Sequence, residues 1–196
     1  MAKLYFKYGA MGSAKTAQAL ITKFNYEERG LKVWLIKPST DTRDGEAVLA
    51  SRAGLSSVCT PIARGENLFE LFVGEHGDCN VIIADECQFF TAEQIDDMRK
   101  IVNALDVPVL CFGLRTDFLT KLFEGSKRLF EVADSFSEIK TICSCGRKAT
   151  VSARIKDGKI VTKGSKVLLG GDDRYLAMCH KCYSDRIESE ANENGN

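Results

Sequence analysis

A glycine- and alanine-rich segment near the start of the chain lies between a short apolar run and an amphipathic run. Residues 4–8 are predicted to be a strand, and residues 15–28 are predicted to be a helix. The apolar face of that helix would carry Ala17, Leu20, Ile21 and Phe24. In a strand–loop–helix unit, the backbone N–H groups of the loop and the helix N-terminus surround an anion. The order of these runs predicts a phosphate-binding loop made of Gly9, Ala10, Met11, Gly12, Ser13, Ala14, Lys15 and Thr16.

The end of this loop supplies the side chains that a bound nucleotide needs. Lys15 would reach the β- and γ-phosphates, and Thr16 would hold the Mg²⁺ that accompanies them. Ala14 stands where the usual G-x-x-x-x-G-K-[ST] pattern has glycine, so the loop must tolerate a Cβ atom there. The alternative interpretation is a plain glycine turn before a helix that begins with lysine.

Apolar and amphipathic runs continue to alternate through the first two-thirds of the chain. Strands are predicted at residues 33–36, 81–84 and 107–112, and helices at residues 66–73 and 91–104. Residues 39–53 are polar and are predicted to be irregular. Continuous apolar strands between helices predict a parallel sheet covered on both faces. We therefore expect an α/β domain of the P-loop NTPase type, with a mostly parallel sheet flanked by helices, over residues 1–139.

Two acidic residues, Asp85 and Glu86, follow directly after the apolar run at residues 81–84. An aspartate at the end of such a strand supports Mg²⁺ in phosphate-loop proteins, directly or through water. Glu86, one residue further on, could take a proton from a hydroxyl nucleophile or from water. The pattern leaves a small-molecule kinase and an ATPase equally open, and a pair of solvated acids is the alternative to both.

Four of the eight cysteines form two close pairs, Cys143 with Cys145 and Cys179 with Cys182. Four thiolates suit tetrahedral Zn²⁺, and a site with four protein ligands is structural because no position stays open for water. His180, inside the second pair, is an alternative ligand, and free or disulfide-bonded cysteines are the alternative to a metal. The remaining cysteines are expected to be ordinary buried or half-buried thiols: Cys59, Cys79, Cys87 and Cys111.

The composition limits the partners and the compartment that we expect. Lys plus Arg and Asp plus Glu both number 27, and this neutral balance argues against binding nucleic acid through an overall field. No apolar run approaches the length of a membrane-spanning helix, and the start does not read as a signal peptide, so we expect a cytoplasmic protein. We expect a small zinc-binding domain with a lasso-like loop over residues 140–186 and a disordered acidic tail over residues 187–196.

Several motifs in chain order closely resemble the type II thymidine kinases, the family of the vertebrate cytosolic and most bacterial enzymes. They are Y-G-A-M-G-S-A-K-T, D-E-C-Q-F-F, F-G-L-R-T-D-F, C-S-C-G-R-K-A and G-G-D-D-R-Y-L-A-M-C-H-K-C-Y. The similarity runs from about Lys3 to Tyr183, and the first cysteine pair and Ala14 are similar to bacterial members.

The resemblance implies transfer of the γ-phosphate of ATP to the 5′-hydroxyl of thymidine or deoxyuridine. It implies that Glu86 is the general base, with Lys15 and Arg43 at the reacting phosphate. The ATP and Mg²⁺ site would also include Asp41, Asp85, Cys87 and Gln88. The nucleoside site would include Phe89, Phe118, Lys166, Val167, Leu168, Leu169, Gly170 and Tyr175, with the loop tied down by zinc. A homotetramer inhibited by dTTP is implied as well. The alternative is a P-loop ATPase whose zinc module binds a protein or nucleic acid.

Overall fold

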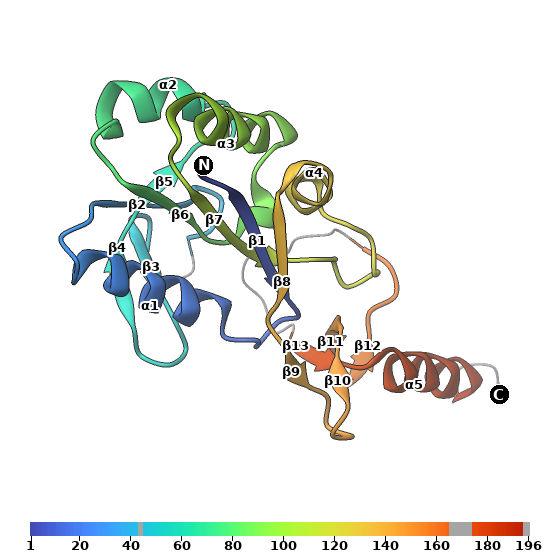
Figure 1. Ribbon diagram of the computed structural model, residues 1–196. Helices are drawn as coiled ribbons and strands as arrows, with labels where there is room; N and C mark the ends of the chain where they lie inside the picture. The colour runs from blue at the N-terminus through green and yellow to red at the C-terminus, as the bar shows by residue number, and fades with distance from the viewer. Residues whose placement is uncertain (43–44, 165–173, 194–196) are drawn as a thin grey trace.

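The computed structural model describes residues 1–42, 45–164 and 174–193. Within them, six parallel strands form the main sheet in the order β5-β2-β6-β7-β1-β8 (Figure 1). These strands are β1 (Leu4–Gly9), β2 (Val33–Pro38), β5 (Thr60–Ile62), β6 (Val81–Ala84), β7 (Val109–Leu114) and β8 (Ser135–Glu138). Nearly every residue of the inner strands β2, β6 and β7 is buried, because both faces of the sheet are covered. The predicted parallel α/β sheet is confirmed.

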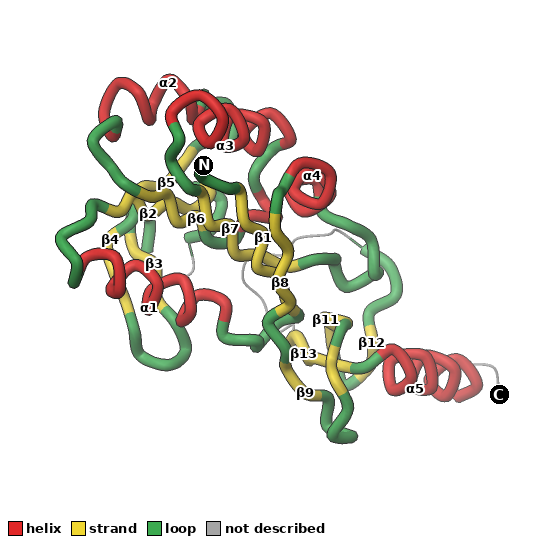
Figure 2. Tube along the Cα trace, viewed as in Figure 1, coloured by secondary structure: helices red, strands yellow, loops and turns green. Residues whose placement is uncertain are grey.

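Helices cover the two faces of this sheet, with α1 on one side and three helices on the other (Figure 2). Helix α1 spans Lys15–Glu27, and the opposite face carries α2 (Leu68–Leu71), α3 (Ala92–Leu105) and α4 (Glu124–Val132). The short helices η1 (Phe72–His76) and η2 (Cys87–Phe89) follow α2 and β6. A capping box begins α3, because Thr91 accepts from the backbone of Gln94, whose side chain accepts from the backbone of Thr91.

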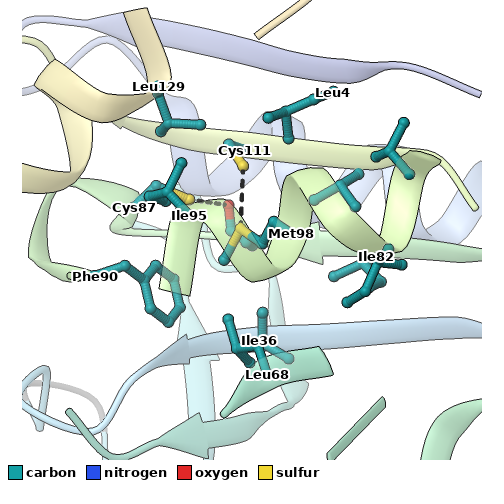
Figure 3. Packing of buried hydrophobic residues seen from close by; sticks show 14 of the residues in the cluster. Leu4, Ile36, Leu68, Ile82, Cys87, Phe90, Ile95, Met98, Cys111 and Leu129 are labelled. Atoms are coloured by element: carbon teal, nitrogen blue, oxygen red, sulfur yellow. Dashed lines mark hydrogen bonds between the residues drawn. The ribbon is translucent and has the colours of Figure 1, made fainter. Parts of the chain in front are cut away.

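The larger of the two core clusters lies between the sheet and helices α2, α3 and α4. Figure 3 shows Cys87, Cys111 and Met98 packed in this cluster. The Cys87 thiol is fully buried and donates to Ala84 O at 3.0 Å. Burial is the main reason that the pKa of this thiol lies well above its usual range. The prediction of a buried thiol at Cys87 is confirmed, and because this side chain belongs to the hydrophobic core, the expected part of Cys87 in the nucleotide site does not involve its thiol.

Helix α1 buries only part of the apolar face that its spacing predicts. Ala17 and Leu20 are buried as predicted, whereas Ile21 and Phe24 are 50% and 58% exposed. At about 100° per residue, Ala19 and Tyr26 share a stripe nearly opposite Ile21 and Phe24. Ala19 is fully buried, and Tyr26 packs against the same core cluster. The prediction is therefore wrong for Ile21 and Phe24, because the helix packs on the sheet through the stripe of Ala19.

The segment at residues 39–53, predicted to be irregular, contains a short strand. Strand β3 (Val48–Ala50) pairs antiparallel with β4 (Ser56–Val58). Leu49 is 2% exposed and packs in the core cluster on the α1 side of the sheet. A single buried leucine in a polar run does not make the alternation of apolar and polar residues that predicts a strand. The hairpin was therefore not predicted.

The last third of the described chain forms small antiparallel sheets next to the main one. Strands β9 (Thr141–Ile142) and β10 (Lys148–Ala149) form a pair, and a second sheet has the order β12-β11-β13. Its strands are β11 (Val151–Lys156), β12 (Lys159–Ile160) and β13 (Arg174–Met178). We call β9 to β13, with the cysteines beside them, the cysteine module. It has its own small hydrophobic cluster, which includes Val151, Ala153 and Met178.

The C-terminal segment is helical where a disordered tail was predicted. Helix α5 spans His180–Glu193, so it includes most of residues 187–196. Ile187 packs against the cluster of the cysteine module, and Glu190 accepts from Ile160 N and from Arg186. One apolar anchor and ion pairs four residues apart stabilise a helix whose composition alone looks disordered. None of the helices in the described part of the chain has the length and apolar character needed to cross a bilayer.

Candidate active site

The glycine-rich segment forms a tight loop between β1 and α1. Gly12 has a φ of 75°, and Ala14, the N-cap residue of α1, has φ 59° and ψ 29° in the left-handed region. An L-residue with a Cβ atom is disfavoured there by about 1–2 kcal/mol. Gly9 is required sterically, because a Cβ atom there would lie 2.4 Å from Ser13 Oγ and 2.5 Å from Ile139 O. The loop therefore keeps the usual backbone shape although Ala14 replaces a glycine.

Lys15 begins α1 and is turned back over the loop. Its side chain is largely buried, and Nζ donates to Ala10 O at 2.9 Å and to Ser13 Oγ at 3.3 Å. A cation beside backbone N–H groups at a helix N-terminus creates an environment that favours an anion. The loop thus places a cation at a helix N-terminus, and its part in binding phosphate stays a prediction.

Thr16 and Asp85 bring the loop and the end of β6 into direct contact. Thr16 Oγ1 donates to Asp85 Oδ2 at 2.6 Å, and Asp85 is 1% exposed. Burial, and next the negative charge of Glu86, raises the pKa of Asp85 to about 7, against the hydrogen bond from Thr16 and the charge of Lys15. Asp85 Oδ1 is buried and has no hydrogen-bond partner in the described part of the chain. A buried carboxylate oxygen without a donor, next to a threonine hydroxyl, fits Mg²⁺ or its bound water.

Glu86 is half-buried and is the N-cap residue of η2, with φ 50° and ψ 36°. This left-handed conformation is uncommon for glutamate, and such strain clusters at functional sites. Gln88 Nε2 donates to Glu86 Oε2, and Gln88 Oε1 accepts from Leu114 N at 2.8 Å. Gln88 is 2% exposed, so it links the Glu86 carboxylate to the end of β7. The arrangement holds a carboxylate beside Asp85 in one orientation.

Some of the remaining residues predicted at the site lie within the described part of the chain, and others lie outside it. Asp41, after β2, is 2% exposed. Burial raises the pKa of the Cys59 thiol, and the negative charges of Asp41 and Asp85 raise it further. Because the strands are parallel, their carboxyl ends meet at one edge of the sheet, where ligands bind in such folds. Six predicted residues lie outside the described residues: Arg43, Lys166, Val167, Leu168, Leu169 and Gly170.

Three aromatic residues expected at the nucleoside have different environments. Phe89 is half-buried, and its ring packs edge to face against that of Phe123, with 5.6 Å between the ring centroids. Phe118 is 1% exposed, and the Arg154 guanidinium lies 5.1 Å from its ring centroid. Tyr175 is half-buried on β13, opposite Arg154 in the strand register. In this conformation Phe118 is covered by the cysteine module, so its contact with a base stays a prediction.

Sequence reasoning missed two buried polar residues next to the loops of this site. Lys37 on β2 is fully buried and donates to the carbonyls of Gly45 and Val48, both at 2.8 Å. These two hydrogen bonds hold the segment that follows Asp41 against β2. A lysine at the end of an apolar strand could have indicated a buried cation with such partners. Ser152 on β11 is 4% exposed and accepts from Met11 N at 2.9 Å. No sequence pattern indicates that contact, because it joins residues that are 141 positions apart.

The two cysteine pairs converge as predicted. The sulfurs of Cys143, Cys145, Cys179 and Cys182 all lie within 4.8 Å of one another. Tetrahedral Zn²⁺ with Zn–S bonds of about 2.3 Å places its sulfurs about 3.8 Å apart, and Cys145 Sγ lies 3.7 Å from Cys179 Sγ. His180 does not belong to the cluster and is exposed at the start of α5. These residues fit a four-thiolate metal site.

Backbone donors further support anionic sulfur in this cluster. Hydrogen bonds from the backbone at Cys145 and Cys179 lower the pKa of Cys143 to about 6. The Cys182 N–H donates to Cys179 Sγ at 3.5 Å and is the main cause of a lowered pKa at Cys179. The neighbouring cysteines, by contrast, raise the pKa of Cys182 to about 12, because hydrogen bonds among the crowded sulfurs favour its protonated form. The thiolate is the form that binds a metal ion, so the backbone prepares Cys143 and Cys179 for ligation.

Comparison with known proteins places this site in a family. The sequence model of the family described as thymidine kinase matches residues 2–183. The thymidine kinase of Yersinia pseudotuberculosis is 42% identical over 192 residues, which cover 96% of this chain and 98% of the relative. The thymidine kinase of Shewanella oneidensis is 40% identical over 190 residues, which cover 95% of this chain and 99% of the relative. The thymidine kinase of Escherichia coli K12 is 39% identical over 194 residues, which cover 97% of this chain and 95% of the relative. With matches of this extent and identity, the chain belongs to the thymidine kinase family.

Proposed function

We propose that this chain transfers the γ-phosphate of ATP to the 5′-hydroxyl of thymidine, and of deoxyuridine, to give the nucleoside monophosphate and ADP. The observation that carries the proposal is the contact between Thr16 and Asp85, with the Glu86 carboxylate beside them. It joins the proposed phosphate-binding loop to Asp85, a carboxylate that could bind Mg²⁺, and to Glu86, the candidate general base, at one edge of the sheet. Membership of the thymidine kinase family supports the choice of substrate.

Each side chain has a distinct part in this reaction. The loop N–H groups and Lys15 bind the donor phosphates. Thr16 and Asp85 would hold Mg²⁺, which would supply positive charge beside the transferred group. Glu86 accepts the proton of the 5′-hydroxyl as that oxygen attacks the γ-phosphorus. Gln88 holds the Glu86 carboxylate in place through the N–H of Leu114. The role of Arg43 at the reacting phosphate and that of Asp41 in the ATP and Mg²⁺ site stay predictions.

The cysteine module, with Phe89 and Phe118 from the main domain, provides the nucleoside side of the proposed site. Tyr175, Phe118 and Phe89 would contact the base or sugar, and the backbone of residues 166–170 would read the base edge. A backbone N–H and C=O pair discriminates well, because a wrong base would leave those groups unpaired. Zn²⁺ held by the four cysteines would be structural. Its role would be to fix the two ends of the segment that contains residues 166–170.

The family resemblance also suggests regulation, assembly and location. We propose inhibition by dTTP, a homotetramer and a cytoplasmic location, with neither nucleic acid nor a membrane as partner. The exposed Ile21 and Phe24 on α1 are apolar enough to support burial against another subunit.

The proposed reaction is tested by measuring initial rates of ADP formation from Mg·ATP with each nucleoside in turn. We expect ADP formation to require thymidine or deoxyuridine and to equal the monophosphate formed. ADP release at the same rate without any nucleoside would overturn the kinase and support the ATPase alternative.

A further inference from the structure

The tip of the phosphate loop is fastened to the cysteine module. Met11 N donates to Ser152 Oγ at 2.9 Å. The neighbouring Gly12 O accepts from Thr141 Oγ1 at 3.5 Å, a longer contact. Ser152 thus fixes the backbone at the tip of the loop, whose other N–H groups the proposed function assigns to the ATP phosphates.

Ser152 itself lies in a rigid setting. It is 4% exposed and belongs to β11, the central strand of the sheet β12-β11-β13. In the register with β13, Ser152 lies opposite Ala177 and Val151 opposite Met178. A buried hydroxyl on a strand that is paired with β13 at this position, and with β12 from Ile155 on, has little freedom to follow the loop. The position of Met11 is therefore set by the strand.

The same strand is tied to the four cysteines. Met178, paired with Val151, directly precedes Cys179, and the backbone of Thr150 donates to Met178 O at 2.9 Å. Cys143, Cys179 and Val151 share the small hydrophobic cluster of the module. An ion bound by the cysteines would hold these segments together, because metal binding supplies folding free energy to small modules. A short path of packed and paired residues thus runs from the cysteine cluster to Ser152.

We propose that Ser152 is a positioning residue that couples the four-cysteine cluster to the phosphate loop, so that a metal ion held by the cysteines strengthens nucleotide binding. The proposal rests on the proposed function only in that this loop binds a nucleotide. Ser152 orders the loop before the nucleotide arrives, and a loop ordered in advance loses less entropy on binding. Without the metal, β11 would loosen, and the Met11 N–H would lose its fixed acceptor.

The test measures the affinity for the non-hydrolysable complex Mg·AMP-PNP by calorimetry, with no nucleoside present. The wild type, Ser152→Ala and Ser152→Thr are compared with zinc bound and after its removal by a chelator. Ser189→Ala is the matched control, because the Ser189 hydroxyl lies in α5, is exposed and donates to Arg186 O far from the loop in the chain.

With zinc bound, we expect Ser152→Ala to bind the analogue about tenfold more weakly, because the loop must then be ordered when the nucleotide binds, and losing one ordering hydrogen bond has an effect of about this size. Ser152→Thr, which keeps the hydroxyl, and Ser189→Ala should stay within about twofold of the wild type. Removing zinc should weaken the wild type by a similar tenfold but change Ser152→Ala by less than about twofold. This loss of coupling is a result that general destabilisation would not produce.

Two results would overturn the proposal. One is wild-type affinity for the analogue in zinc-bound Ser152→Ala, and the other is an equal effect of zinc removal in both proteins. If circular dichroism shows that the metal-free module unfolds, the zinc-bound comparison of Ser152→Ala with Ser152→Thr decides alone. A chain that binds the analogue with this coupling but does not phosphorylate thymidine would refute the proposed reaction and leave the coupling intact.

Discussion

Replacing Ala14 with glycine should stabilise this protein. Ala14 has φ 59° and ψ 29°, where its Cβ atom is disfavoured by about 1–2 kcal/mol and glycine is not. It is also the N-cap residue of α1 and makes no side-chain capping bond, a position at which glycine is preferred to alanine. Glycine makes the unfolded chain more flexible, which offsets about 0.4–1 kcal/mol of the gain. The expected net gain in unfolding free energy is about 0.5–1 kcal/mol, or about 1–4 °C in Tm for a chain of this size.

The assay is urea denaturation followed by the fluorescence of Trp34, the single tryptophan of the chain. Trp34 is 3% exposed and stacks on His76 at 4.4 Å, so unfolding changes its surroundings completely. Ala19→Gly is the matched control, because Ala19 lies inside the same helix and is fully buried. Glycine there should lower the unfolding free energy by about 1 kcal/mol from helix propensity alone. If Ala14→Gly lowers stability as Ala19→Gly does, the reasoning from backbone strain is refuted.

Three further changes test the site and its supports. Glu86→Gln should cut kcat by about 10²–10⁴, because a general base is lost, while calorimetry shows nucleotide affinity nearly unchanged; wild-type turnover would remove Glu86 from the mechanism. Cys179→Ser should release the bound metal and abolish thymidine binding while Trp34 still reports a folded main sheet. Full thymidine affinity in that metal-free, folded variant would contradict a structural role for the ion. Gly125→Ala should lower stability by about 1–3 kcal/mol in thermal denaturation, because its Cβ atom would lie 2.3 Å and 2.8 Å from two backbone oxygens of η2 and the residue after it. An unchanged Tm would show that α4 moves away at no cost.

The sheet, the phosphate loop and the cysteine cluster could be predicted because local patterns specify them. Apolar strands buried on both faces differ visibly from polar connections, as at residues 81–84. The loop at Gly9 depends on backbone shape that small residues allow. Each cysteine pair is a local signal of a metal knuckle, and two such signals in one chain predict that the four sulfurs meet. In each case, a short local pattern marks the feature, and the fold then brings the marked segments together.

Features that depend on contacts between distant segments could not be predicted. Helical spacing gave α1 more than one apolar stripe, and only the packing of Ala19 against the sheet shows why Ile21 and Phe24 are exposed. The acidic C-terminal segment becomes helical because Ile187 packs against the cysteine module. Sequence patterns indicate which side chains are apolar, but tertiary packing decides which of them are buried.

The most direct test of the proposed phosphoryl transfer follows the label from [γ-³²P]ATP with thymidine or 5′-deoxythymidine as the acceptor. The second nucleoside keeps the base and lacks only the hydroxyl that Glu86 would deprotonate. We predict label in thymidine monophosphate with thymidine, and neither a labelled nucleotide product nor free labelled phosphate with 5′-deoxythymidine. Labelled inorganic phosphate in equal amounts with both nucleosides, and no labelled thymidine monophosphate, would contradict the account.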